Sequence, residues 1–369
     1  MFPFSHISFA GRQTEEISSL DNEEIVRSLN GRALALLDAT LSREENSPHG
    51  FGRFRQTSPD SGGITSRQVL IGLMGLERLR SSGTHETPRF PKLQEFLLAD
   101  SHWVRGAGDL GLLAWFTAVC APERLGNLFN QFDFYAALER QAEAFEIDTT
   151  GIALFLAGIS HARISGKAGM PDLSDAALMA YRLLQKNQGD SGIFGQSSLC
   201  WRIRSLFYSR FGRLNDQMYA IYALSMFARA YRVEEPLALA LSCANAICST
   251  QGENGEWWFR YDKRTSRVAK RFPLFPLQQE GTAPLALGTL SEACNRSFHA
   301  AILKGISWSH RASRASQGMI PGQSPAQGDA NRILGSTRLD HLGWALYASE
   351  TLGFSQGIAQ VRVRSANGL

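Results

Sequence analysis

Two segments of the chain carry the same pattern of residues, 63 positions apart. One runs from Gln188 to Phe194 and the other from Gln251 to Trp257, and both read glutamine, three residues, glycine, one residue and an aromatic. Each segment follows an apolar run with the three- and four-residue spacing of a helix. Gly189 and Gly252, directly after the two glutamines, stand where a glycine in the left-handed conformation commonly ends a helix. The repeat therefore predicts a chain that is built from successive helical hairpins.

The spacing of apolar residues predicts about twelve helices along the chain. They cover residues 22–41, 65–80, 91–99, 108–120, 134–145, 149–162, 174–187, 215–232, 235–250, 281–294, 297–309 and 338–352. The alternation that is typical of a strand is weak and is confined to residues 361–364. Long loops are predicted at residues 42–63, 195–215 and 255–281.

This number of helices, with long loops between successive pairs, favours an all-α fold. The expected architecture is a single (α/α)6-type toroid, in which inner and outer helices alternate around a central cavity. A helical solenoid is the alternative, but it requires a more regular repeat than this chain has. The expected organisation is an N-terminal extension at residues 1–20, the toroid domain at residues 21–355 and a C-terminal tail at residues 356–369.

The composition is that of a globular protein, with 44% hydrophobic and 20% charged residues in a chain of 369. A net charge of +4 is too small to favour a nucleic-acid partner. The five cysteines have no Cys-x-x-Cys spacing, so we expect buried free thiols and a cytoplasmic protein. The start of the chain does not resemble a secretory signal, and the longest apolar run, residues 110–121, is too short to span a bilayer. The oligomeric state stays open.

Residues 251–257 resemble the glutamine–tryptophan motif of the squalene and terpenoid cyclase superfamily, in which the glutamine caps an outer helix and the tryptophan packs over the turn. Residues 257–285 also resemble a bacterial family without an assigned function, close to the terpenoid cyclase and protein prenyltransferase toroids. That family reads His-Gln-Asp-Gly-Met-Ala-Pro where this chain reads Gln-Gln-Glu-Gly-Thr-Ala-Pro at residues 278–284. The resemblance covers residues 65–350 and implies a toroid that acts on an isoprenoid.

The segment from Glu146 to Gly151 resembles the acidic Asp-x-Asp-Asp-Thr-Ala motif of class II terpene cyclases, whose aspartic acid protonates an alkene or an epoxide. The resemblance implies that Asp148 is the proton donor and that Glu146 stands beside it. Such a step needs a protonated carboxyl that faces an apolar cavity. The alternative is that Asp148 or Thr149 is the N-cap of the following helix.

Aromatic and basic residues after the second glutamine form the next candidate site. Trp258 and Tyr261 would bind substrate, because aromatic faces stabilise carbocations and stack on sugar rings. Six cations follow within twelve residues, namely Arg260, Lys263, Arg264, Arg267, Lys270 and Arg271. They could hold a diphosphate, and Mg²⁺ would then be expected with it; otherwise no cofactor is expected. A solvated charged loop is the alternative.

Several polar residues are expected at the mouth of the toroid. Glu280 would act as a base or an orienting group, with Gln279 beside it, just before a helix predicted to start near Thr282. Asp262 and Asp216 would also contact substrate. For Glu280, Gln279 and Asp216, which stand at predicted helix starts, capping is the alternative.

Three functional hypotheses follow. The first is an isoprenoid cyclase that starts with protonation by Asp148. The second is a glycan-processing lyase, epimerase or hydrolase that uses Tyr261, Asp262 and Glu280. The third is a non-catalytic binding protein. The histidines have no paired metal spacing, and no Gly-x-Ser-x-Gly or Walker-type phosphate loop is present. The expected partner is a small molecule, with peripheral membrane association allowed and no nucleic acid.

Overall fold

The computed structural model describes residues 22–46, 64–83, 87–144, 147–166, 170–197, 209–273, 276–317 and 342–348; within these ranges the side chains of residues 22–29, 32, 272–280 and 312–317 lie outside the description. The helices are α1 (Asn22–Glu45), α2 (Ser66–Ser81), α3 (Pro91–Ala99), α4 (Ala107–Cys120), the 3-10 turn η3 (Pro122–Arg124), α5 (Leu125–Gln131), α6 (Phe134–Glu143), α7 (Thr149–Ser165), α8 (Ser174–Asn187), α10 (Leu214–Tyr231), α11 (Glu235–Ser249), α12 (Pro276–Cys294) and α13 (His299–Gln317). A further helical segment covers residues 342–348.

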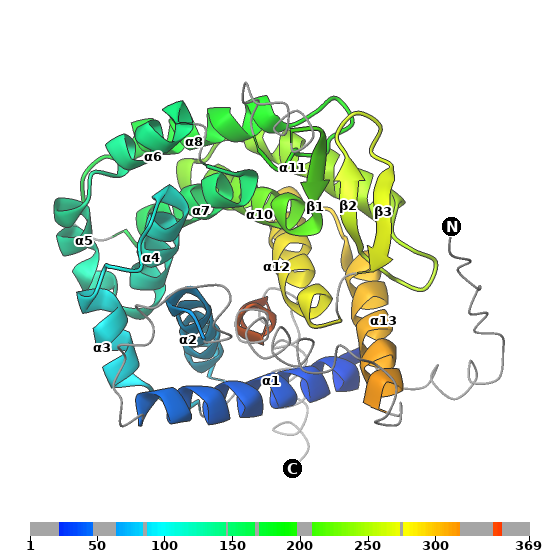
Figure 1. The fold of residues 1–369 in the computed structure, drawn as a ribbon, viewed down its shortest axis with the longest axis horizontal. Coiled ribbons are helices and arrows are strands. Elements are labelled where there is room, and N and C mark those ends of the chain that lie inside the picture. The colour runs from blue at the N-terminus through cyan, green and yellow to red at the C-terminus, as the bar shows by residue number, and fades with distance from the viewer. Residues whose placement is uncertain are drawn as a thin grey trace, which may run out of the picture.

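The helices lie in two concentric layers (Figure 1). The inner layer consists of α2, α4, α7, α10, α12 and the segment 342–348, and the outer layer of α1, α3, α5, α6, α8, α11 and α13. Inner and outer helices alternate along the chain, except that α5 and α6 both lie outside. The prediction of a mainly helical protein is confirmed.

The inner helices α4 and α7 are apolar on nearly all sides, as expected for helices that other elements surround. In α7, residues 151–160 are all buried, and α4 is buried from Ala107 to Thr117 except at Asp109. Glycines allow close packing within this layer. A methyl group at Gly158 of α7 would overlap the carbonyl of Gly111 in α4.

A second pair of glycines brings the last described inner segment against the first inner helix. A methyl group at Gly75 of α2 would overlap the backbone of Gly343, so the last inner element packs directly against the first. Close backbone contact of this kind is possible only where neither residue carries a side chain at the contact. The helical segment at residues 342–348 therefore lies directly against α2.

The two glutamines of the repeated pattern have the same structural role. The Gln188 Nε2 donates to a carbonyl of its own turn and to the carbonyl of Leu239 in the next outer helix, α11, at 2.9 Å. The Gln251 Nε2 likewise donates within its own turn and to the carbonyl of Ala301 in α13, at 3.0 Å. Each glutamine therefore ties the end of one outer helix to the start of the next.

The glycine and the aromatic residue of the pattern are also equivalent in the two copies. Gly192 and Gly255 have φ angles of 86° and 109°, which favour glycine, and each lies against the backbone of the following outer helix. Phe194 and Trp257 are fully buried. The prediction that the two segments are matched helix-end turns is confirmed. The left-handed glycines of the two segments are Gly192 and Gly255, so the prediction of this conformation for Gly189 and Gly252 is wrong.

A small sheet was not predicted. Strands β1 (Phe211–Arg213), β2 (Trp258–Asp262) and β3 (Val268–Pro273) form an antiparallel sheet in the order β1-β2-β3. The predicted loop at residues 255–281 is therefore wrong, because it contains the hairpin of β2 and β3 and the start of α12. The strand β1 runs directly into α10 and β3 precedes α12, so the sheet lies at the N-terminal ends of these inner helices (Figure 1).

Candidate functional site

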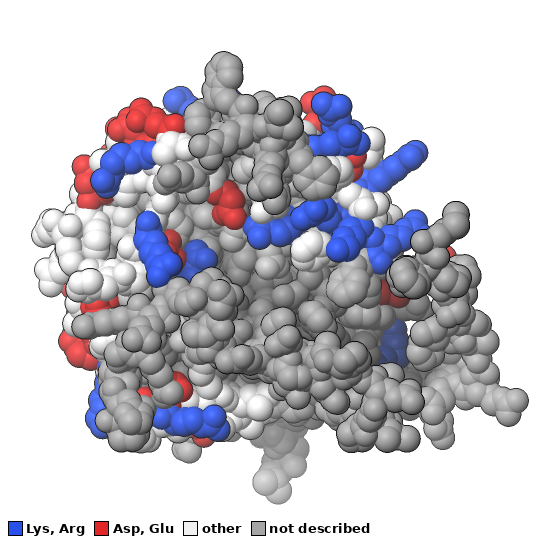
Figure 2. Space-filling model, viewed as in Figure 1, with Lys and Arg blue, Asp and Glu red and all other residues white. Residues whose placement is uncertain are grey.

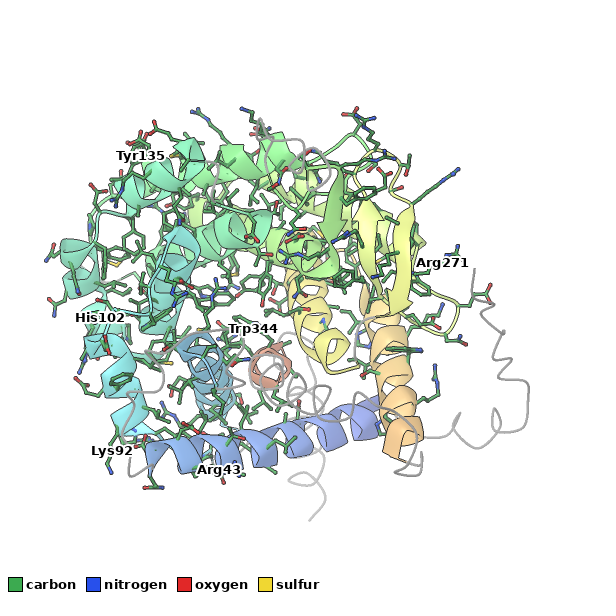
Figure 3. The ribbon with its side chains drawn as sticks, viewed as in Figure 1. Arg43, Lys92, His102, Tyr135, Arg271 and Trp344 are labelled. Atoms are coloured by element: carbon green, nitrogen blue, oxygen red, sulfur yellow. The ribbon has the colours of Figure 1, made fainter. Side chains whose placement is uncertain are left out.

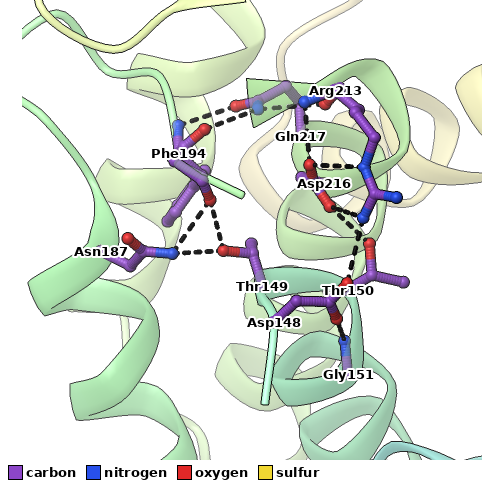
Figure 4. A network of polar contacts seen from close by, with 10 residues as sticks. Asp148, Thr149, Thr150, Gly151, Asn187, Phe194, Arg213, Asp216 and Gln217 are labelled. Atoms are coloured by element: carbon purple, nitrogen blue, oxygen red, sulfur yellow. Dashed lines mark hydrogen bonds and ion pairs between the residues drawn. The ribbon is translucent and has the colours of Figure 1, made fainter. Parts of the chain in front are cut away.

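Asp148, Arg213 and Asp216, which we call the rim site, meet where the inner helices α7 and α10 begin (Figure 4). Asp148 is the N-cap of α7, and its Oδ1 accepts the Gly151 N–H at 2.8 Å. Its Oδ2 pairs with the Arg213 Nη2 at 3.0 Å. The capping role that the sequence left open for Asp148 is confirmed, and its role as proton donor stays a prediction.

Asp216 is fully buried at the start of α10. Its carboxylate accepts the backbone N–H of Arg213 at 2.8 Å, the Arg213 Nη2 at 3.0 Å and the Thr150 hydroxyl at 2.7 Å. Burial raises the pKa of Asp216, against the opposing effect of Arg213 and Thr150, and the negative charge of Asp148 adds to the rise. The two carboxylates thus share one guanidinium nitrogen, but only one of them is removed from solvent.

The first repeated turn is joined to the rim site by side chains (Figure 4). Gln217, next to Asp216, accepts the Phe194 N–H at 2.8 Å and donates to the Phe194 carbonyl at 2.9 Å. Thr149 donates to the Gly195 carbonyl at 2.5 Å. These contacts hold the starts of α7 and α10 against the turn, so the helix ends that carry the rim site are fixed from the outer layer.

The predicted binding residues of β2 are engaged within the sheet. Tyr261 is fully buried, and its hydroxyl accepts the Trp258 N–H at 3.2 Å. The Trp258 indole N–H donates to the Thr250 carbonyl at 2.8 Å. Burial disfavours the charged form of Asp262, but Arg210, at 2.7 Å, and backbone N–H groups outweigh it and lower the pKa of that carboxyl.

The structure describes the remaining predicted site residues only in part. Arg260 lies over the ring of Phe259, 5.6 Å from its centroid, and the Arg264 side chain is exposed. Glu146 lies outside the described residues, and so do the side chains of Gln279 and Glu280. The helix predicted near Thr282 begins earlier, at Pro276, so residues 278–280 belong to its first turn rather than to a loop.

A cluster of rings between the inner helices escaped the sequence prediction. We call it the aromatic centre, and it consists of Trp115, His161, Tyr219, Tyr222, Trp344 and Tyr347. Trp115 is stacked on His161 with the ring centroids 4.7 Å apart and on Tyr222 at 4.8 Å, and it meets Trp344 at 4.7 Å. Figure 3 shows Trp344 near the middle of the ring of helices. Trp115 and Trp344 are fully buried.

Polar atoms of the aromatic centre bond to one another. The His161 Nε2 and the Tyr222 hydroxyl are 2.7 Å apart. The indole N–H of Trp115 donates to the Tyr347 hydroxyl at 3.2 Å, and the indole N–H of Trp344 donates to the Tyr219 hydroxyl at 2.8 Å. Hydrogen bonds of this kind offset the cost of burying polar groups.

Burial lowers the pKa of His161 to about 3, with further lowering by the positive charges of Arg78 and Arg229. The imidazole is therefore neutral at physiological pH. His161 is half-buried, and a titratable group with a strongly shifted pKa, held by a specific hydrogen bond, is a frequent mark of a functional site.

The rim site and the aromatic centre lie at different depths along the same helices. His161 follows Asp148 by thirteen residues and Tyr222 follows Arg213 by nine. At 1.5 Å of rise per residue, these separations correspond to about 20 Å and about 13 Å along the helix axes. The aromatic centre therefore lies well below the helix ends that carry the rim site.

Comparisons of the chain with protein-family models, curated proteins and solved structures gave no match. Within the described ranges, no group of three or more histidine, cysteine, aspartate or glutamate side chains could hold a metal ion. None of the helices in that part of the chain is long and apolar enough to cross a membrane.

Proposed function

We propose that the chain is a single-domain α/α toroid of the terpenoid cyclase-like kind. Three observations support this fold: the alternation of inner and outer helices, the direct contact of Gly343 with Gly75, and the glutamine ties between successive outer helices. The glutamine ties are what the resemblance to the glutamine–tryptophan motif leads one to expect.

The proposed activity is the cyclisation of an isoprenoid, begun by protonation. The aromatic centre carries this proposal, because inner helices from distant parts of the chain bring five benzene-type or indole rings and one imidazole to one place. The faces of such rings attract a carbocation. An apolar core alone would not require the five hydroxyl and indole groups that hydrogen-bond there.

The rim site supplies the proton in this proposal. The O–H bond of a carboxyl breaks, the π electrons of the substrate alkene form a new C–H bond, and the neighbouring carbon becomes the cation. Arg213 then stabilises the carboxylate that remains. Asp148 is the donor that the resemblance to class II terpene cyclases implies. Asp216 has the environment that a donor needs, because burial raises its pKa.

The basic residues of β2 and β3 would face the diphosphate if the substrate is a prenyl diphosphate. Mg²⁺ would accompany such a group. The described residues offer no acidic cluster for this ion, and the proposal has no step that depends on it. The glycan alternative places Tyr261 at an open cleft, whereas its ring is fully buried.

The test is incubation of the protein with geranyl, farnesyl and geranylgeranyl diphosphate, followed by product analysis by gas chromatography and mass spectrometry after dephosphorylation. We expect a cyclic product that keeps its diphosphate. Replacing the donor, by Asp148→Asn or Asp216→Asn, should lower the rate by about a hundredfold or more.

Asp133→Asn is the matched control, because Asp133 caps the outer helix α6 through the Ala136 N–H as Asp148 caps α7. It should leave the rate unchanged. The absence of a cyclic product from all three substrates would leave the non-catalytic hypothesis in place. Normal rates in both rim variants would remove the rim site from the reaction.

A further inference from the structure

The hairpin of β2 and β3, residues 258–273, is the most strongly charged surface element of the described chain, and we call it the basic hairpin. It carries six lysines and arginines and a single acid, Asp262. Asp262 is already paired with Arg210 of the neighbouring segment. Figure 2 shows Lys and Arg gathered over the part of the viewed face where Figure 1 places the sheet.

Three of these cations have no counter-charge among the described residues. Arg264 and Arg267 lie in or next to the hairpin turn and Arg271 on the edge strand β3, and all three are exposed. None of them forms an ion pair with any residue that the structure describes. Figure 3 shows Arg271 at the outer edge of the sheet. The three positions span the turn and the edge strand, a spread that suits an extended anionic surface.

An aromatic side chain lies among the cations. Phe259 is half-buried, with Arg260 over its ring at 5.6 Å and Lys270 at 5.8 Å from the centroid. Aromatic rings and basic side chains together are typical of proteins that contact the interface of a bilayer. The net charge of the chain is only +4, so the attraction is local to this hairpin and not a property of the whole protein.

We infer that the basic hairpin docks the protein on an anionic lipid surface. The hairpin lies at the N-terminal ends of α10 and α12, the same end of the inner layer as the rim site. Docking there turns that end of the molecule toward the bilayer. The docking does not depend on the proposed function. The further step, in which the bilayer supplies the apolar substrate, rests on the proposed function.

The experiment is co-sedimentation of the full chain with vesicles of phosphatidylcholine alone or with 30% phosphatidylserine, at low and at high salt. We expect binding to the anionic vesicles only, and its loss at high salt because the attraction is screened. The variant Arg264→Gln/Arg267→Gln/Arg271→Gln should bind roughly a hundredfold more weakly, at roughly fivefold for each arginine.

A matched control carries Arg43→Gln, Arg182→Gln and Lys186→Gln, three exposed cations on the outer helices α1 and α8. Both variants lower the net charge by three. The control leaves the basic hairpin unchanged, so it should keep its binding. Equal losses in the two variants, equal binding to neutral vesicles, or tighter capture of a single-stranded RNA than of anionic vesicles would each overturn the inference. Because no turnover is measured, a failure here is separate from a failure of the proposed cyclisation.

Discussion

The rim site and the aromatic centre are built on the same inner helices, yet their polar groups are stabilised in different ways: by charge pairing at the rim and by hydrogen bonds between neutral groups in the centre. At the rim, two carboxylates are held by one guanidinium, and the charges are paired. In the centre, imidazole, phenol and indole groups are neutral and bond to one another. Burial disfavours the anionic form of Asp216 at the rim and the cationic form of His161 in the centre. The contributions of the two regions to the free energy of unfolding should therefore change with pH in opposite directions.

The largest effect is expected in the aromatic centre. Trp115→Ala removes the ring on which His161, Tyr222 and Trp344 pack, and it should lower the free energy of unfolding by about 3 to 5 kcal/mol. Urea denaturation followed by circular dichroism measures the change. A loss below about 1 kcal/mol would show that the centre is not a packed unit.

His161 should make the folded protein sensitive to acid. Its pKa is lowered to about 3. Below pH 6.5 the unfolded chain therefore binds a proton at this residue that the folded protein does not bind. The wild type should therefore lose about 1.4 kcal/mol per pH unit below 6.5 from this group. In His161→Gln this part of the slope should vanish, whereas it should persist in a control, His102→Gln, whose ring is exposed.

Asp216 should give the opposite slope. Its pKa lies above the ordinary 3.8, so the folded protein keeps a proton that the unfolded chain releases. The stability that this group contributes is present below pH 3.8 and is lost as pH rises through the raised pKa. Relative to Asp216→Asn, the wild type should thus lose stability as pH rises above 3.8. A gain in stability with rising pH would mean that Arg213 lowers the pKa of Asp216 by more than burial raises it.

The smallest effect is expected at Asp148. Asp148→Ala removes one N-cap and one partly exposed ion pair, and it should cost about 1 kcal/mol of unfolding free energy. Asp133→Ala at the cap of α6 should cost a similar amount, which thermal or urea denaturation can show. A loss at Asp148 several times larger would place this carboxylate with Asp216 as a buried charge.

Local features of the structure were predictable from the sequence. The bounds predicted for α3 and α8 agree with the structure, and those for α10 and α11 agree within one residue. Amphipathic spacing and end signals are properties of neighbouring residues, so they are visible without the fold. The same holds for the Asp148 cap and for the glutamine turns. The strands of the basic hairpin were not predicted, because its lysines and arginines interrupt the alternation of apolar and polar residues that is typical of a strand.

The aromatic centre could not be predicted as a site, because it depends on contacts between distant segments. Trp115 and Tyr347 are 232 residues apart and meet only when their helices pack together in the inner layer. A weak signal was present, since Tyr219 with Tyr222 and Trp344 with Tyr347 are spaced by three residues and so share a helix face. Nothing in the sequence pairs one such face with the other.

The central claim is that the aromatic centre receives a carbocation, and its most direct test is binding of a prenyl ammonium analogue against its neutral carbon analogue by titration calorimetry. The wild type should prefer the cation by about tenfold or more. Trp115→Leu should abolish this preference, and Trp308→Leu on the outer helix α13 should retain it. Equal affinity of the wild type for the two analogues, or an unchanged preference in Trp115→Leu, would contradict the claim.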